Sequence, residues 1–274
     1  MDDLQQLQDV FLEAARRACG AVQAVYVSDF SVDRKSDQSP VTEADLAAEA
    51  AILDHLRTCH VGIPVVSEEA VAAGIIPDLA ASYILVDPLD GTREFVNRNG
   101  EFTVNIALVV EGEPVLGAVF APALDEAFWG LKGQGAYRSC IGADGADMRA
   151  DATRIQVAEG VNADWRAVAS RSHLSSETEA FLARNPIGET VSFGSSLKLC
   201  RLAEGRADIY PRLSPTNQWD IAAGDAVLRA AGGITVDTQG QIFCYEAPKP
   251  LRAKGFLNPW FVACGGIDPS QVSF

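Results

Sequence analysis

The N-terminal region contains two segments in which apolar side chains recur every three or four positions. Residues 3–19 carry the apolar stripe Leu4, Leu7, Phe11, Ala14 and Ala18, and Gly20 follows. This is the spacing of one helix face, and glycine commonly ends a helix. A second helix is predicted from Thr42, with the apolar stripe Leu46, Ala50, Leu53 and Leu56. The chain therefore should begin with two amphipathic helices.

Short apolar runs separated by turn signals come next, and they predict strands. The predicted strands are residues 63–66, 83–86, 103–110, 115–120 and 126–131. The residues Glu111-Gly112-Glu113-Pro114 have the composition of a turn, so the third and fourth strands should form a hairpin. The first half is thus predicted to pack helices against a largely antiparallel sheet.

Helices and strands alternate in the second half. Residues 142–153 are rich in Gly, Ala and Asp, and we place the boundary near this segment. The predicted order beyond it is strand 167–169, helix 175–183, strand 190–193, helix 196–204, strand 207–210, helix 221–231 and strand 234–236. Alternation of this kind is typical of α/β structure. We therefore predict an α+β part over residues 1–155 and an α/β part over residues 156–274.

Composition and charge narrow the class of protein. The 274 residues are 48% hydrophobic and carry a net charge of −15, which argues against binding to a nucleic-acid polymer. No apolar run approaches the roughly 20 residues of a transmembrane helix. The N-terminus lacks the features of a signal peptide, and no basic amphipathic helix indicates attachment to a membrane surface. The six scattered cysteines contain no CxxC pair, so we expect thiols in a reducing cytoplasm.

The segment Asp87-Pro88-Leu89-Asp90-Gly91-Thr92 places two carboxylates directly after a continuous apolar strand. Such a segment makes an acceptable turn, but turns seldom need two acids at the end of a buried strand. Carboxylate oxygens bind hard divalent cations, and the backbone N–H groups of Gly91 and Thr92 can bind an anion. These are the usual parts of a phosphate-ester site.

Three further acids lie where either helix capping or metal binding would explain them. Glu68 follows Ser67, which can cap the next helix. Asp45 completes a Thr-x-x-Asp capping pattern with Thr42, and Asp220 could cap the helix that follows it. Capping is the simpler explanation for each acid alone. Four acidic positions at strand ends or helix starts, with the pair described above counted as one position, are nevertheless what a shared metal cluster requires.

Three segments, in this order and spacing, resemble the signature of the inositol monophosphatase superfamily. They are Ser67-Glu68-Glu69, Asp87-Pro88-Leu89-Asp90-Gly91-Thr92 and Trp219-Asp220-Ile221-Ala222-Ala223-Gly224. Members of this superfamily are Mg²⁺-dependent, lithium-sensitive phosphatases, and the resemblance covers nearly the whole chain. It implies a mixed α+β and α/β fold, layered as an α-β-α-β-α sandwich. It also implies two or three Mg²⁺ ions and a small phosphorylated substrate.

Four other segments resemble the 3′(2′),5′-bisphosphate nucleotidase branch of this superfamily. They are residues 99–108, Ser170-Arg171-Ser172-His173, Gly194-Ser195-Ser196-Leu197-Lys198 and Tyr210-Pro211-Arg212. Enzymes of this branch remove the 3′-phosphate of 3′-phosphoadenosine 5′-phosphate, a by-product of sulfate assimilation. Arg93 stands where the family often has lysine, which keeps the positive charge.

The resemblance assigns metal-ligand roles by position. The implied ligands are Glu68, Asp87, the backbone carbonyl of Leu89, Asp90 and Asp220. A carbonyl ligand explains why an apolar residue can stand at position 89. Asp87 would bridge two ions, with Glu68 and Leu89 on one side and Asp90 and Asp220 on the other. The N-terminal part would thus carry the metal-binding motifs, and the C-terminal part would complete the metal site and the substrate pocket.

The resemblance also implies catalytic and substrate-binding roles. Thr92 and Asp45 would orient an attacking water, so that the phosphoryl group passes directly to water. The implied substrate-binding residues are Glu68, Leu89, Asp90, Gly91, Thr92, His173, Ser195, Lys198, Arg212 and Asp220. A solvated helix face and an ordinary strand-end charge are the alternative explanations for Lys198 and Arg212. His173 could instead cap the next helix.

Other functions remain open from the sequence. A sister enzyme that hydrolyses inositol monophosphate or a sugar bisphosphate would use the same metal ligands. A phosphatase of the haloacid dehalogenase type has an Asp-x-Asp-Gly-Thr motif after an apolar strand, but this chain has one extra residue between its two acids. A non-catalytic protein that binds metal or phosphate is a third alternative. Members of the superfamily are often dimers, so a homodimer is a further expectation.

Overall fold

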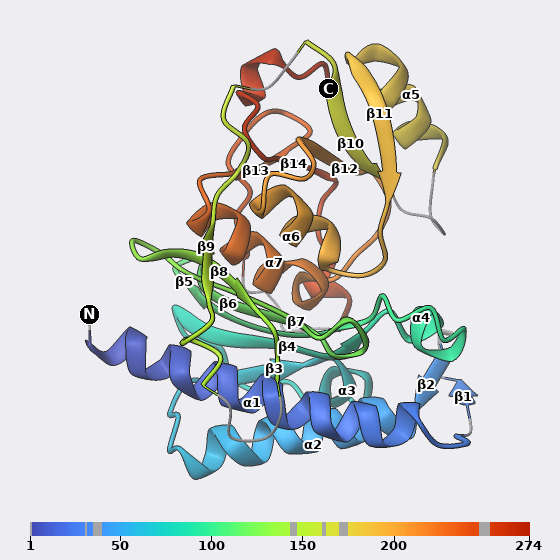
Figure 1. The fold of residues 1–274 in the computed structure, drawn as a ribbon. Coiled ribbons are helices and arrows are strands. Elements are labelled where there is room, and N and C mark those ends of the chain that lie inside the picture. Colours follow the sequence, from blue (N-terminus) through green and yellow to red (C-terminus); the bar gives the residue numbers. More distant parts are fainter. Residues whose placement is uncertain are drawn as a thin grey trace.

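Two large sheets alternate with three layers of helices in the described part of the protein (Figure 1). The computed structural model describes residues 2–30, 32–34, 40–142, 147–160, 163–169, 175–246 and 253–274. From one side to the other, the layers are α1 with α2, a large sheet, α6 with α7, a smaller sheet, and α5. This order confirms the predicted α-β-α-β-α sandwich.

The larger sheet has seven strands in the order β3-β4-β5-β6-β7-β8-β9. Their bounds are β3 Val65–Ser67, β4 Ser82–Asp90, β5 Thr103–Val110, β6 Glu113–Ala121, β7 Glu126–Leu131, β8 Gly135–Ser139 and β9 Thr153–Ile155. Strands β3 and β4 are parallel, and the other neighbouring strands are antiparallel. Glu111 and Gly112 join β5 to β6 with positive φ angles, as a tight hairpin turn requires. The predicted antiparallel sheet and its hairpin are confirmed.

Helices α1 (Asp2–Tyr26) and α2 (Glu43–Thr58) cover the outer face of this sheet. A two-stranded sheet of β1 (Val32–Arg34) and β2 (Pro40–Thr42) precedes α2. The prediction that the first helix ends at Gly20 is wrong. Val22 is fully buried on the next turn and continues the apolar stripe. At Gly20 an added Cβ would meet no atom within 4 Å, so this glycine does not interrupt packing.

Helices α6 (Leu197–Ala203) and α7 (Gln218–Ala230) lie between the two sheets. Two paired glycines, Gly117 on β6 and Gly130 on β7, let α7 rest against the sheet backbone. A Cβ on Gly117 would lie 2.2 Å from the carbonyl oxygen of Ala223, and one on Gly130 would lie 2.8 Å from Cα of Val227. A helix of the second half of the chain is therefore seated on the sheet of the first half.

The smaller sheet has five strands in the order β11-β10-β12-β14-β13. Their bounds are β10 Trp165–Ala169, β11 Ile187–Ser192, β12 Ile209–Arg212, β13 Ile234–Asp237 and β14 Phe261–Cys264. Helix α5 (Ser176–Arg184) covers the outer face of this sheet. Strand β14 has no counterpart among the predicted strands, although it is a continuous apolar run. The division of the chain at residue 155 stays a prediction. Helices α6 and α7 belong to the second half of the chain but pack against the sheets of both halves, so this packing does not mark a boundary.

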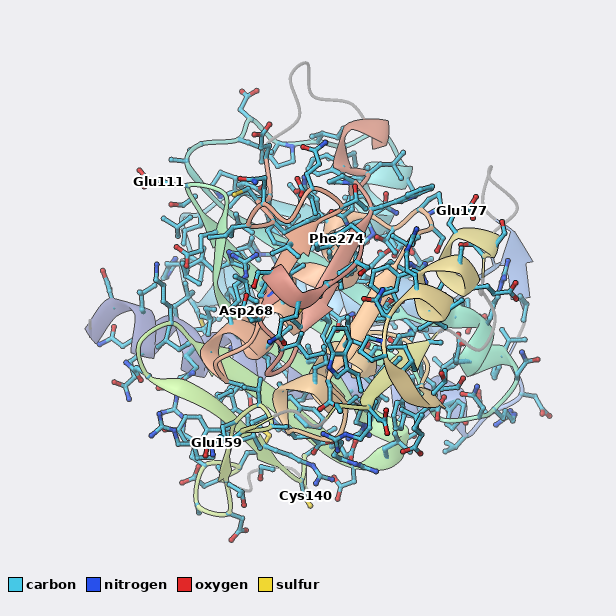
Figure 2. The ribbon with its side chains drawn as sticks, turned by 90° about the horizontal axis from the view of Figure 1, so that it is seen from above. Glu111, Cys140, Glu159, Glu177, Asp268 and Phe274 are labelled. Carbon is cyan, nitrogen blue, oxygen red and sulfur yellow. The ribbon has the colours of Figure 1, made fainter. Side chains whose placement is uncertain are left out.

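The remaining elements are short, and the surface is acidic. They are α3 Glu68–Ala72, α4 Thr92–Val96, and the 3₁₀ helices η1 Pro122–Leu124, η2 Ala253–Phe256 and η3 Pro269–Gln271. Exposed acids such as Glu111, Glu159 and Glu177 project at separate edges of the molecule (Figure 2). All six cysteines are free thiols. Within the described ranges, every helix is too short or too polar to span a bilayer.

Candidate metal centre and active site

The two aspartates of β4 face the same side of the sheet because the strand is interrupted between them. In a regular strand, residues three apart face opposite sides. Here Asp87 pairs with Asn105 and Asp90 pairs with Thr103, so three steps along β4 match two steps along β5. The extra residue forms a bulge, where Pro88 needs no ladder hydrogen bond. Both carboxylates therefore point toward the layer of α6 and α7.

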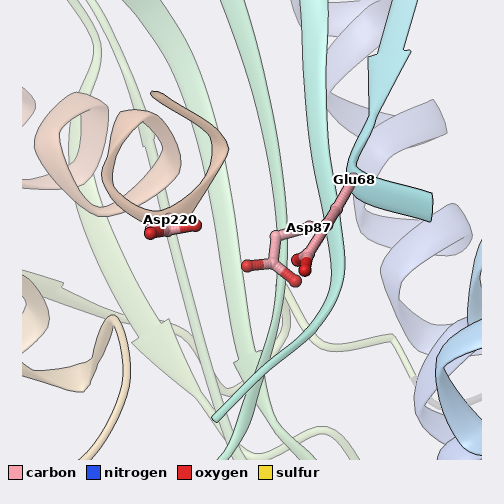
Figure 3. A group of neighbouring side chains, drawn as sticks. All are labelled: Glu68, Asp87 and Asp220. Carbon is pink, nitrogen blue, oxygen red and sulfur yellow. The ribbon is translucent and has the colours of Figure 1, made fainter. Parts of the chain in front are cut away.

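Three acids from distant parts of the sequence meet at the end of β4 (Figure 3). Glu68 begins α3, Asp87 lies on β4, and Asp220 lies in the first turn of α7. One carboxylate oxygen from each lies within 4.8 Å of the other two. Asp87 is only 1% exposed. Carboxylates this close repel one another, so the arrangement favours a bound cation that offsets their charge.

Asp220 caps its helix and also belongs to this carboxylate cluster of Glu68, Asp87 and Asp220. Its Oδ2 accepts a hydrogen bond from the backbone N–H of Asn217 at 2.8 Å, within a capping box. Burial raises the pKa of Asp220 well above its ordinary value, and the negative charges of Asp90 and Glu68 raise it further. A bound cation would have the opposite effect. Capping and metal binding are therefore compatible explanations for this residue.

Asp45 has a similar double role. Its Oδ2 accepts hydrogen bonds from the backbone N–H of Thr42 at 2.7 Å and from the Thr42 hydroxyl at 2.8 Å. Its Oδ1 accepts a hydrogen bond from the Thr92 hydroxyl at 3.2 Å. The capping box thus fixes the carboxyl of this 2% exposed acid so that its second oxygen holds Thr92. Because the Thr92 hydroxyl donates its proton to this hydrogen bond, its oxygen can accept a hydrogen bond from another group.

Asp90 is held by two serines that precede α6. The Ser195 hydroxyl donates to Oδ2 of Asp90 at 2.5 Å and lies 2.5 Å from the hydroxyl of Thr103. The Ser196 hydroxyl lies 3.0 Å from the same oxygen of Asp90 and 2.6 Å from the carbonyl oxygen of Asp220. Ser195 has a φ of 52°, a strained conformation that these contacts maintain. Ser196 therefore links the acid of β4 to the helix that carries Asp220.

Replacing Ser196 by alanine should raise the Mg²⁺ concentration needed for half-maximal thermal stabilisation by about 10- to 100-fold, as for other groups that orient metal ligands. The loss follows because one oxygen of Asp90 and the first turn of α7 both lose a hydrogen-bonding partner. The unfolding midpoint, measured over a Mg²⁺ titration, tests this expectation. Ser176→Ala, at an exposed position on α5, is the matched control. An unchanged titration for Ser196→Ala would contradict the linking role.

The backbone of Leu89 faces the site, while its side chain packs in the core beneath α1 and α2. The Leu89 N–H donates to Oδ1 of Asp87 at 3.1 Å, and its carbonyl oxygen lies 3.4 Å from the Thr92 hydroxyl. The predicted ligands therefore offer only oxygen atoms. An oxygen-only donor set fits Mg²⁺ or another hard cation and does not fit a soft one.

A cleft of about 320 Å³ opens above the carboxylate cluster. The predicted site residues that line it are Glu68, Asp87, Leu89, Asp90, Gly91, Thr92, Ser195, Lys198, Arg212 and Asp220. Asp45 lies behind Thr92, to which it is hydrogen-bonded. His173 lies outside the described residues. The structure thus gathers the described candidates in one place, and their individual roles stay predictions.

Two cationic side chains line the cleft. Lys198 is only 6% exposed, so the alternative explanation of a solvated helix face does not apply to it. Its Nζ donates to the carbonyl oxygen of Ser195 at 2.8 Å and lies 5.8 Å from the centroid of the Tyr210 ring. Arg212 donates through Nη2 to the carbonyl oxygen of Pro215 at 3.2 Å. Its buried Nε has no hydrogen-bond partner among the described residues, which leaves a donor for an anion.

Sequence reasoning gave no individual role to Ser196, Asn105 or Glu94. Asn105 lies across from Asp87 on β5, and both polar atoms of its buried amide lack a partner in the described part of the chain. A polar residue inside the apolar run of β5 was a usable signal, because buried amides need hydrogen bonds. Ser196 and Glu94 carry no such signal. Their importance appears only when the loop before α6 is folded against β4.

Comparisons with known proteins agree with this architecture. The model of the inositol monophosphatase family matches residues 3–263. A 3′(2′),5′-bisphosphate nucleotidase CysQ of Salmonella typhimurium is 43% identical over 251 residues, which cover 91% of this chain and 96% of that protein. Inositol monophosphatase 2 of Solanum lycopersicum is 28% identical over 267 residues, which cover 94% of this chain and 97% of that protein.

Solved structures show the same relationship. The crystal structure of CysQ from Bacteroides thetaiotaomicron, a bacterial member of the inositol monophosphatase family, is similar with a TM-score of 0.79 at 37% identity. The similarity covers 96% of this chain and 98% of that chain. Because the family match extends over nearly all of its length, this protein belongs to the inositol monophosphatase family.

Proposed function

We propose that this protein is a Mg²⁺-dependent phosphomonoesterase that converts 3′-phosphoadenosine 5′-phosphate to AMP and phosphate. The observation that carries the proposal is the carboxylate cluster at the floor of a cleft whose wall holds Lys198 and Arg212. Acids alone would attract cations, and bases alone would attract anions. A phosphate ester bound through Mg²⁺ needs both. The substrate itself is proposed from the relatives named 3′(2′),5′-bisphosphate nucleotidase.

The metal ligands in this proposal are Glu68, Asp87, the carbonyl oxygen of Leu89, Asp90 and Asp220. They would hold two or three Mg²⁺ ions, and Asp87 lies between Glu68 and Asp220 in this set. When bound, Mg²⁺ supplies positive charge that polarises the phosphoryl group and activates water at neutral pH. The chain itself supplies rigid ligands, since Ser195, Ser196 and the capping boxes hold the acids in place before the substrate arrives.

Thr92 and Asp45 orient the attacking water in our proposal. The Thr92 hydroxyl donates a hydrogen bond to Asp45, so the Thr92 oxygen can accept a hydrogen bond from a water O–H. The water oxygen then forms a bond to phosphorus as the bond from phosphorus to the ribose oxygen breaks. The water loses a proton, and the leaving ribose oxygen takes up a proton to become a hydroxyl group. The alternative of a covalent phosphate on Asp87, as in phosphatases of the haloacid dehalogenase type, is disfavoured by the bulge and by the position of this acid between two others.

The proposed substrate has two phosphate groups, and the cleft offers a separate binding site for each. The backbone N–H groups of Gly91 and Thr92 would bind the scissile phosphate near the metal ligands. Lys198 and Arg212 would bind the second phosphate, with Ser195 beside them. A role in sulfate assimilation or nucleotide recycling, a cytoplasmic location and a homodimer complete the proposal, on the strength of the family resemblance.

A substrate panel tests this function. Phosphate release from 3′-phosphoadenosine 5′-phosphate, inositol 1-phosphate and fructose 1,6-bisphosphate should be compared as kcat/KM, with Mg²⁺ and after chelation. We expect the nucleotide to be preferred by about 10-fold or more, as expected when extra polar contacts recognise one substrate. Chelation should abolish turnover, and lithium should inhibit it. Asp90→Asn tests whether the measured activity comes from this site, and it should lower the rate of phosphate release by about 100-fold. Preference for inositol 1-phosphate would favour the sister activity instead.

A further inference from the structure

Glu94 lies in the wall of the cleft, beside the residues proposed to bind the scissile phosphate. It belongs to α4, which begins one residue after Gly91. A Cβ on Gly91 would lie 3.2 Å from Oε2 of Glu94, and a Cβ on Gly194 would lie 3.1 Å from its Cγ. Two glycines thus leave the space that this side chain occupies. Packing against Gly91 and Gly194 therefore holds the Glu94 side chain in the wall of the cleft.

No cation neutralises Glu94 by direct contact among the residues that the structure describes. Its carboxyl accepts a hydrogen bond from its own backbone N–H. The neighbouring charged groups are Asp90, Lys198 and Glu101, and Lys198 already donates to the carbonyl oxygen of Ser195. Burial raises the pKa of Glu94, and the Asp90 carboxylate adds to this effect.

An acid that has no cationic partner next to a phosphate site is unfavourable unless the ligand supplies a donor. Phosphate oxygens repel a carboxylate, and one backbone hydrogen bond does not replace all the hydrogen bonds to water that a half-buried carboxyl loses. A hydroxyl group on the ligand resolves both difficulties, because its O–H donates to the carboxylate. Sugars that carry a phosphate on one carbon and a hydroxyl on the next present such a donor beside the phosphate.

We propose that Glu94 accepts a hydrogen bond from the sugar hydroxyl on the carbon next to the phosphorylated carbon. The inference rests on the proposed function, for which this hydroxyl is the ribose 2′-OH. A substrate phosphorylated at the 2′ position would offer its 3′-OH in the same relation. A single acceptor can therefore serve either isomer while it excludes the deoxyribose substrate. Glu94 is thus a specificity-determining residue.

The test compares adenosine 3′,5′-bisphosphate with its 2′-deoxy analogue on one preparation of each variant. The wild type should prefer the ribonucleotide by about 10- to 100-fold in kcat/KM, as expected for a charge-assisted hydrogen bond. Glu94→Ala should reduce this ratio to about 1, and Glu94→Gln, which keeps an acceptor oxygen, should retain part of it. Partial unfolding lowers both rates equally and leaves the ratio unchanged.

Glu101→Gln is the matched control. Glu101 has a comparable charge nearby, but its Oε2 accepts the backbone N–H of Gly194 at 2.9 Å and it does not line the cleft. Its variant should keep the wild-type ratio. Equal hydrolysis of both nucleotides by the wild type, or an unchanged ratio in Glu94→Ala, would overturn this inference alone. Absence of hydrolysis of either nucleotide would overturn the proposed function with it.

Discussion

Replacing Asp87 by asparagine should lower kcat by about 1000-fold, at the upper end of the losses seen when a charge-stabilising group is removed. Such a factor corresponds to about 4 kcal/mol of transition-state stabilisation. Asp87 is buried and lies between Glu68 and Asp220 (Figure 3). It is a ligand of the metal ions in the proposed function. Asparagine has nearly the same shape but no charge, so the change isolates the electrostatic contribution. Steady-state phosphate release measures it.

The same variant should be more stable than the wild type when divalent cations are removed. It removes one of the three carboxylates that lie together at the end of β4, and so relieves part of their mutual repulsion. Burial and the negative charges of Asp90 and Glu68 raise the pKa of Asp220 in this cluster. A carboxyl with a raised folded-state pKa contributes stability below its unfolded pKa, and that stability is lost as the pH rises through the folded pKa. The gain should therefore be largest at neutral pH and should shrink as the pH falls. Thermal unfolding after chelation, over a pH series, measures it.

Asp78→Asn removes the same charge from an exposed position and is the control for both measurements. It should leave kcat unchanged and should not reproduce the pH-dependent gain in stability. If Asp87→Asn kept wild-type activity in the presence of Mg²⁺, the role of Asp87 as a metal ligand would be excluded. A lower midpoint than the wild type after chelation would show that the carboxylates do not repel one another in the folded protein.

Replacing Gly117 by alanine should destabilise the protein by about 3 kcal/mol or more, at the high end for overpacked cores. The new Cβ would lie 2.2 Å from the carbonyl oxygen of Ala223, and this backbone atom cannot move without shifting α7. Since α7 carries Asp220, the variant should also lose cation-dependent activity. Urea unfolding with and without Mg²⁺ measures both effects.

Gly20→Ala provides the contrast. The added Cβ meets no atom within 4 Å in α1, and alanine is the better helix former, so we expect a gain of about 1 kcal/mol. If the free energy of unfolding falls in Gly117→Ala and rises in Gly20→Ala, the destabilisation comes from the contact between α7 and the sheet. Equal, small changes at both positions would mean that α7 can retreat from β6 without loss.

The periodicity of the chain was sufficient to predict most elements but not their ends. The run of β5 and the turn at Glu111 and Gly112 are local signals, and they were predicted correctly. The continuation of α1 beyond Gly20 depends on burial of Val22 against the sheet, which is a tertiary effect. Strand β14 lies between β12 and β13, and its partners come from earlier in the chain. Its continuous apolar run is a local signal for a strand, but the sequence does not show which strands it pairs with.

For the site, sequence spacing and family resemblance indicated which acids to consider, and the structure shows how they meet. The bulge between Asp87 and Asp90 cannot be inferred from their spacing, because a regular strand would separate them. The capping patterns of Asp45 and Asp220 argued against a site role when each was taken alone. In the folded chain one oxygen of each acid caps its helix, and the carboxyl still reaches the site.

Because α7 packs on the larger sheet, binding of a metal ion at the carboxylate cluster should require that both halves of the chain are folded. Asp87 and Asp220 lie far apart in sequence, so an ion held by both closes a long loop as a crosslink does. Neither half of the polypeptide expressed alone would contain all three acids of the carboxylate cluster. Removal of the ion by a chelator should therefore make backbone segments far from the cluster more accessible to proteases. Tight binding of the ion should distinguish a completely folded molecule from one in which only the first half has folded.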